Sequence, residues 1–266
     1  MADALTTWFT ESPFSRDLGV VRRADGRVAI SSNRAQVAGD VLHGGAVAAL
    51  AALAAQGTDP EVRSTNTSLQ IDYVRAARGD GFSATASTVR RVRELGFHRT
   101  TVHDADGQVV AVAGGTLSAE RAGRGNASPA TPLAPDPGDF SRALGTMPFL
   151  LDRGLRVGGV GRGEFEVTMP PAERNLDANG RIHVGAVLTL IDVAGTSVPW
   201  TLARPSGTGA TVSLQARFLG EVPAGGLTAR ARVRAHDDRV HWSDIEVFAA
   251  EERELCALGS VVYRFA

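Results

Sequence analysis

Two short motifs in this chain place a histidine and a glycine at the start of an apolar stretch, and only one of them is followed by an acid. Residues 43–45 read His-Gly-Gly, and residues 183–185 read His-Val-Gly, 140 positions later. Asp192 follows the second histidine by nine residues and lies between aliphatic neighbours, whereas the first copy has Ala52 there. A buried carboxylate is costly unless it has partners, and burial raises its pKa toward the range of a general base. Asp192 is therefore a candidate base or nucleophile, with a structural acid paired to an arginine as the alternative.

The two glycines of the first motif can expose backbone N–H groups to a ligand. The first turn of a helix has unpaired N–H groups and the positive end of the helix dipole. Gly44 and Gly45 have no side chain to block an approaching carbonyl oxygen, so we assign them, chiefly the N–H of Gly45, to carbonyl polarisation. The alternative is that they allow tight packing of helix on sheet. His43 either holds the loop or assists the carbonyl.

The resemblance between the two motifs extends along the whole chain. Residues 13–14 recur as 148–149 at an offset of 135, and residues 68–70 recur as 213–215 at an offset of 145. Gly114 and Gly259 keep the same offset of 145. The period is too long for a stacked repeat, which indicates a duplicated domain. The expected divisions are a first domain over residues 1–117, a linker rich in Pro, Ala and Gly over 118–138, and a second domain over 139–266.

Each half repeats one order of expected elements. An amphipathic segment (5–17 and 140–152) precedes two short strands and then an apolar helix, with Pro199 expected to end or kink the second helix. Four strands with period-two alternation follow, separated by turn signals. Since the helix is apolar on nearly every side, it must be buried. The pattern predicts an α+β fold in which an antiparallel sheet wraps around a central helix.

Composition and charge exclude several classes of function. The net charge is −1, from 28 basic and 29 acidic residues, and gives no sign of nucleic-acid or membrane binding. We find no secretory signal and no apolar run long enough for a membrane span, so we expect a cytoplasmic protein. Cys256 is expected in the core. His98 with His103, and His236 with His241, are spaced by five, which on one strand puts them on opposite faces and argues against a metal pair.

A sheet wrapped around a helix that begins with His-Gly-Gly resembles the hotdog-fold acyl-CoA thioesterases, especially those of the phenylacetate-pathway type. Their pattern is Asn-x-x-Gly-x-x-His-Gly-Gly, an acid nine residues after the histidine, and a Ser or Thr on the following strand. The resemblance covers residues 5–117 and 139–266. It implies two tandem hotdog domains paired as a pseudo-dimer, an acyl-CoA substrate and no cofactor.

In the resembled enzymes, each site combines the glycine loop of one hotdog with the acid of the other. Carried over, Asp192 and Thr211 of the second half would face the loop of the first half across the interface. The resemblance thus implies one catalytic set, formed by His43, Gly45, Asp192 and Thr211, with Gly44 binding substrate.

The reciprocal site has a different composition. It would combine Asp177, His183 and Gly185 with Ala52 and Asn66, so these positions could bind substrate but lack a base on their helix. Neither half has the asparagine of the family pattern six residues before its histidine, where the second half has Asp177. One working site per chain is therefore expected.

The sequence favours a cytoplasmic double-hotdog acyl-CoA thioesterase, and two alternatives remain open. One is a hotdog (R)-specific enoyl-CoA hydratase or dehydratase, although the close Asp and His of those enzymes are missing. The other is a non-catalytic acyl-CoA binder. Arg90, Arg91 and Arg93 are candidates for the coenzyme A phosphates, with solvated surface as the alternative. The outer surfaces of the pair leave room for a homo-oligomer.

Overall fold

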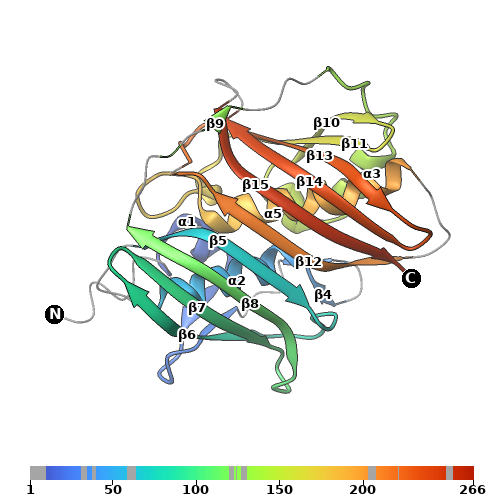
Figure 1. The fold of residues 1–266 in the computed structure, drawn as a ribbon. Coiled ribbons are helices and arrows are strands. Elements are labelled where there is room, and N and C mark those ends of the chain that lie inside the picture. Colours follow the sequence, from blue (N-terminus) through green and yellow to red (C-terminus); the bar gives the residue numbers. More distant parts are fainter. Residues whose placement is uncertain are drawn as a thin grey trace.

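The fold consists of two similar α+β halves that share one antiparallel sheet (Figure 1). The computed structural model describes residues 10–30, 35–37, 40–58, 64–119, 123, 125–126, 131–202, 208–220, 222–249 and 254–266. Part of the expected N-terminal segment (5–9) and most of 120–130 therefore lie outside the described residues. The predicted α+β class with two tandem hotdog domains is confirmed.

The first half places four long strands around one apolar helix. A short helix and four short strands come before the apolar helix. The long hairpin strands follow it, as the period-two alternation of apolar residues predicted. In chain order the elements are α1 (Pro13–Leu18), β1 (Val20–Arg22), β2 (Val28–Ile30), β3 (Gln36–Val37), β4 (Val41–Leu42), α2 (Gly44–Gln56), β5 (Ser64–Tyr73), β6 (Phe82–Val92), β7 (Leu95–His103), β8 (Val109–Ala119) and β9 (Gly125–Asn126).

The second half repeats this order. Its helix ends as an α-helix just before Pro199 and continues as a 3₁₀ turn, as expected from a proline that removes a backbone donor. The elements are α3 (Asp139–Gly145), α4 (Pro148–Asp152), β10 (Arg156–Gly161), β11 (Glu164–Met169), η2 (Glu173–Asn175), α5 (Val184–Ser197), η3 (Val198–Thr201), β12 (Gly209–Phe218), β13 (Leu227–His236), β14 (Val240–Ala249) and β15 (Glu254–Phe265).

The halves join through β5 and β12, which run antiparallel at the centre of the sheet. Gln70 faces Gln215 in this pair. These two glutamines are equivalent in the repeat, at an offset of 145. Leu69 likewise faces Ala216, and Ile71 faces Leu214, so the pairing is symmetric about the glutamines. The register thus places a pseudo-twofold axis between the halves.

Helices α2 and α5 lie side by side on one face of the sheet and share one hydrophobic core (Figure 1). Their close approach depends on glycine, because a Cβ on Gly45 would lie 2.6 Å from the Thr189 backbone and one on Gly185 would lie 2.8 Å from the Ala49 side chain. Residues 184–201 have the length and apolar composition of a membrane span, but 72% of this window is buried. We therefore read it as the core helix of the second half.

The short N-terminal helix of each half packs on the histidine loop of the other half. The ring of Phe14, from α1, stacks on His183 at a centroid distance of 4.3 Å. The ring of Phe149, from α4, contacts His43 at 5.5 Å. Between the two phenylalanines lies the fully buried Arg153, within cation–π distance of both rings, and it forms an ion pair with Asp17. These contacts tie both histidine loops to the partner half.

Two details of the sequence reading were wrong. Gln70 pairs with Gly114, whereas Gln215 pairs with Ser260, so the last strand follows an offset of 146 rather than 145. The extra residue lies between the paired positions Phe248 and Leu255, which six residues separate, whereas five separate His103 and Val109. His236 and His241 are not on one strand: they face each other across the β13–β14 hairpin with rings stacked at 5.2 Å. Within the described residues, no group of three or more potential metal ligands is found.

Candidate functional site

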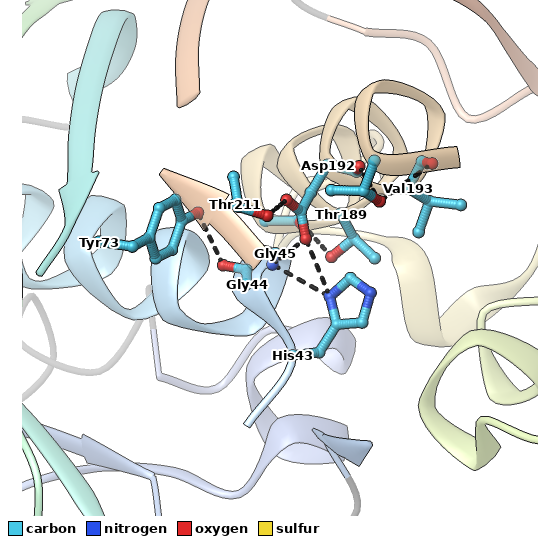
Figure 2. Close-up of polar contacts among 10 residues, drawn as sticks. His43, Gly44, Gly45, Tyr73, Thr189, Asp192, Val193 and Thr211 are labelled. Carbon is cyan, nitrogen blue, oxygen red and sulfur yellow. Dashed lines mark hydrogen bonds and ion pairs between the residues drawn. The ribbon is translucent and has the colours of Figure 1, made fainter. Parts of the chain in front are cut away.

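Asp192 lies at the junction of the two halves, with both carboxylate oxygens hydrogen-bonded (Figure 2). Its Oδ2 accepts the backbone N–H of Gly45 at 2.9 Å, from the first turn of α2. Its Oδ1 accepts the hydroxyl of Thr211 at 3.0 Å, from β12. The side chain is nearly inaccessible to solvent. The structure therefore brings Asp192, Thr211 and Gly45 together, as the resemblance implied, from segments far apart in the sequence.

His43 completes this cluster as the N-cap of α2. Its Nδ1 accepts the same Gly45 N–H at 3.0 Å, and this nitrogen lies 3.4 Å from Asp192 Oδ2. One N–H is therefore shared by two acceptors. Because burial lowers the pKa of His43 against the opposing effect of Asp192, we treat the ring as neutral, with its proton on Nε2.

Burial is also the main influence on the acid. It raises the pKa of Asp192 above the ordinary value for an aspartate, while His43, the Thr211 hydroxyl and the Gly45 N–H oppose the rise. The Thr211 hydroxyl and the Gly45 N–H, which donate to the two oxygens, also fix the direction of the carboxylate. A buried, oriented carboxylate with a raised pKa is suited to take a proton from a neutral group such as water.

The predicted role of Gly45 needs a correction in detail. We expected its N–H to point at a substrate carbonyl, but in the structure it points at Asp192 and His43. A carbonyl oxygen could reach this donor only by sharing it or by displacing the carboxylate. The immediate effect of the α2 start, with its positive dipole end, is to orient and stabilise Asp192.

The absence of a side chain at Gly44 makes room for the acid. A Cβ there would lie 2.8 Å from Asp192 Oδ2. In the repeat, Gly44 corresponds to Val184 and Asp192 corresponds to Ala52. Because the halves are related by the pseudo-twofold axis, the larger Val184 is expected to face the smaller Ala52, as Gly44 faces Asp192. The exchange of glycine for valine and of aspartate for alanine keeps the volume at the two helix starts similar.

The residues assigned to the reciprocal site do not form a comparable cluster. His183 caps α5 through Gly185, at 2.9 Å, but the Phe14 ring stacks on it, and a Cβ on Gly185 would lie 2.5 Å from that ring. Burial, with Arg153 nearby, lowers the pKa of His183 to about 3. Asn66 is buried in β5, and its Nδ2 has no hydrogen-bond partner among the described residues.

Two further predicted contacts lie elsewhere. The Asp177 carboxylate accepts the backbone N–H groups of Asn179 and Arg181, at 2.7 and 3.0 Å, so it shapes its own turn. The arginine run over residues 90–93 lies at the β6–β7 hairpin. Across β7 and β8, which lie between them, this hairpin is level with Asn66 in the sheet. The run therefore flanks the reciprocal position.

Sequence reasoning missed two tyrosines near the acid. The Tyr73 hydroxyl donates to the Gly44 carbonyl oxygen at 3.0 Å (Figure 2). Tyr263 pairs with Thr211 across β12 and β15. Burial, with the negative charge of Asp192 as a further cause, raises the pKa of Tyr73. A signal did exist in the repeat, because Tyr73 corresponds to Phe218, so the two halves differ by a hydroxyl here as well.

Comparisons with known proteins agree with this architecture. Residues 33–118 match the family described as acyl-CoA thioesterase N-terminal domain, and residues 179–256 match the family described as thioesterase superfamily. No curated protein matches the sequence. Each half therefore carries its own thioesterase-type hotdog domain.

Solved structures share the double-domain fold at low sequence identity. A Thermobifida fusca protein provisionally named thioesterase II is 18% identical with a TM-score of 0.72, and the alignment covers 96% of this chain and 98% of that one. A hot-dog-fold protein of unknown function from Alicyclobacillus acidocaldarius is 17% identical (TM-score 0.70, 97% of both chains). An acyl-CoA thioesterase II from Mycobacterium marinum is 16% identical (TM-score 0.68, 94% and 95%). The chain is therefore a tandem hotdog protein whose two halves each match a thioesterase family model, and it is a thioester hydrolase.

Proposed function

We propose that this enzyme hydrolyses acyl-CoA thioesters at one site, formed between the two halves around Asp192. The observation that carries the proposal is the pair of hydrogen bonds that hold Asp192, one from Gly45 of the first half and one from Thr211 of the second. The acyl-CoA substrate class is supported by the family matched over residues 33–118. The finer likeness to the phenylacetate-pathway type stays a prediction.

Asp192 acts as a general base in this proposal. Its carboxylate takes a proton from a water that also bonds to the Thr211 hydroxyl oxygen, which keeps lone pairs free while it donates to Asp192. The resulting hydroxide attacks the thioester carbonyl carbon. The tetrahedral intermediate then releases the thiolate, which takes the proton back from Asp192, leaving the free acid and the coenzyme A thiol. The positive end of α2 stabilises the negative charge that develops on the carbonyl oxygen.

The reciprocal position is inactive in this proposal. It has Ala52 in place of the acid and Asn66 in place of Thr211. The Phe14 ring covers the His183 and Gly185 backbone where a substrate would have to enter. Its residues therefore serve packing between the halves, and one active site per chain follows.

The first experiment measures thiol release from a panel of acyl-CoAs. We expect turnover by the wild type and a loss of at least about a hundredfold in kcat for Asp192→Asn, since the amide cannot accept the proton. The conservative variant Glu246→Gln, on the partly exposed outer part of β14, is a matched control for charge removal. If Asp192→Asn keeps its turnover, Asp192 is not the base.

A single turnover in water labelled with ¹⁸O separates the base from the nucleophile. With excess enzyme, a general base puts the label into the product acid. A nucleophilic Asp192 would first form an anhydride with the acyl group. Labelled water that attacks the Asp192 carbonyl carbon of this anhydride releases the unlabelled acid and leaves the label in the Asp192 carboxylate. Mass spectrometry of the peptide that contains residue 192 decides between the two.

Two other activities are tested on the same enzyme. Hydration of a crotonyl thioester, followed by loss of the conjugated absorbance, would indicate a hydratase. Thermal stabilisation by acyl-CoA without any thiol release would indicate a binding protein. Either result, in the absence of hydrolysis, would replace the proposed function.

A further inference from the structure

Tyr73 is connected to Asp192 through a single peptide group. The Tyr73 hydroxyl donates to the carbonyl oxygen of Gly44 at 3.0 Å, and the N–H of Gly45 donates to Asp192 Oδ2 at 2.9 Å. The Gly44 carbonyl and the Gly45 N–H belong to the same amide. Figure 2 shows the resulting chain from the phenol through this amide to the carboxylate and on to Thr211.

A hydrogen bond to the oxygen of an amide draws electron density from its nitrogen. The N–H then becomes a stronger donor, and consecutive hydrogen bonds strengthen one another by about 10–30% per bond. The effect is larger where the local dielectric constant is low, and Asp192 is only 2% exposed. Tyr73 can therefore act on the carboxylate without touching it.

We propose that Tyr73 is a positioning residue for hydrolysis, which polarises and holds the Gly44–Gly45 amide so that its N–H orients the Asp192 carboxylate. The inference rests on the proposed function, because it gives Tyr73 a role in the reaction for which Asp192 is the base. It adds a residue that the likeness to thioesterases did not assign. It also explains why a tyrosine lies at the start of α2.

The second half provides an internal comparison. Phe218 occupies the position equivalent to Tyr73, at an offset of 145, and Ala52 occupies the position equivalent to Asp192. The hydroxyl is thus present on the side that has the acid and missing on the side that lacks it. If Tyr73 were needed only to pack β5 against α2, a phenylalanine would serve, as it does in the second half.

The phenol keeps its proton over the working range. Burial, together with the charge of Asp192, raises the pKa of Tyr73. Within the described part of the chain, the groups coupled to Asp192 through charge are His43 at the start of α2, Tyr73 on β5 and Tyr263 on β15. Because a tyrosine is neutral until it loses its proton, His43 is the one of these groups that could change charge near neutral pH, and burial opposes that change.

The test compares Tyr73→Phe with the mirror variant Phe218→Tyr. For Tyr73→Phe we expect kcat to fall about three- to tenfold with KM nearly unchanged, the size of one buried hydrogen bond. We also expect the acid limb of the pH–rate profile to move to higher pH, because a weaker Gly45 donor stabilises the Asp192 carboxylate less. For Phe218→Tyr we expect neither change.

A measurement that does not depend on activity is the ¹H chemical shift of the Gly45 amide. We expect it to move upfield in Tyr73→Phe and to stay in place in Phe218→Tyr. Replacement of Tyr73 by 3-fluorotyrosine, a more acidic phenol and a stronger donor, should move the Gly45 shift and the acid limb in the opposite direction. This second variant retains the ring and hydroxyl, so it remains informative if Tyr73→Phe folds poorly.

The outcomes separate this inference from the proposed function. If Asp192→Asn abolishes turnover while Tyr73→Phe lowers only the melting temperature, with kcat, acid limb and Gly45 shift unchanged, then Tyr73 is structural and the inference is wrong. If Asp192→Asn retains turnover, the proposed mechanism itself fails. Joint movement of kcat, the acid limb and the Gly45 shift supports the inference.

Discussion

Gly44→Ala is expected to damage the active site by direct contact with the acid. The added Cβ would lie 2.8 Å from Asp192 Oδ2, and ordinary Cβ contacts begin at 3.4 Å, so the carboxylate must retreat by the difference, 0.6 Å. If the carboxylate moves away along the direction of the hydrogen bond from the Gly45 N–H, the distance from the Gly45 nitrogen to Asp192 Oδ2 grows from 2.9 Å to about 3.5 Å, where little hydrogen bonding remains. Gly44 is not among the residues with positive φ, so alanine fits its backbone.

The expected effects differ between activity and stability. A misplacement of about 1 Å in a catalytic group can cost roughly 10²-fold in rate, so we expect kcat to fall about ten- to a hundredfold. Weakening the charge-assisted hydrogen bond lowers the free energy of unfolding by about 1.5–3 kcal/mol. The better helix propensity of alanine offsets up to about 1 kcal/mol of this loss. The variant should therefore remain folded, with a net loss of about 0.5–2 kcal/mol.

A double-mutant cycle with Asp192→Ala tests the cause. Without the carboxylate the new Cβ has no clash, and the Gly45 N–H keeps His43 Nδ1 as its acceptor at 3.0 Å. Gly44→Ala should then be neutral or slightly stabilising in denaturant melts, with a coupling of about 1.5–3 kcal/mol. Val184→Ala, at the equivalent position opposite Ala52, is the matched control and should leave kcat unchanged. A kcat for Gly44→Ala within twofold of wild type would refute the crowding argument.

Three further outcomes are expected. Asp192→Asn should raise the melting temperature at neutral pH. The pKa of Asp192 is raised in the folded state, so ionisation of Asp192 lowers the stability of the wild type as pH rises from the ordinary aspartate pKa through the folded-state pKa. The stability that the variant gains over the wild type should therefore shrink in acid. Thr211→Val should lower kcat about tenfold, and Thr211→Ser should restore most of it, in the thiol-release assay. The folded-state pKa of His183 is lowered to about 3, so thermal melts should show the protein losing stability as pH falls from 6.5 toward 3. His183→Asn should make this pH dependence of stability less steep. An unchanged pH dependence would show that another group causes the loss.

The two halves of the site were predictable from the sequence to different extents. Asp192 stood out because it is the only charge in an apolar helix, and the repeat exposed its asymmetry with Ala52. Thr211 and His43 followed from the likeness to a known motif, and the structure brings both to Asp192. The direction of the Gly45 N–H was not predictable, because it depends on where the carboxylate of another domain comes to rest.

The covering of the reciprocal position by Phe14 is a further case. Phe14 and Phe149 are equivalent in the repeat, and each packs on the histidine loop of the opposite half. The sequence marks both as apolar but does not say across which interface they pack. Arg153, buried between them, was not singled out because a single arginine just after an amphipathic segment gives no sign of its depth.

The sequence by itself determined the duplication, the α+β class, the buried helices and the half that holds the acid. The duplication follows from motifs that recur along the chain, and the rest from periodicity and composition, which are local properties of one element at a time. Only the tertiary structure decided that Asp192 meets the Gly45 N–H and that Tyr73 joins the same amide. Asp192 and Gly45 are 147 residues apart, and their contact depends on the β5–β12 register and on the close approach of α2 to α5. Both are set by packing between the halves, to within a fraction of an ångström that no local pattern encodes.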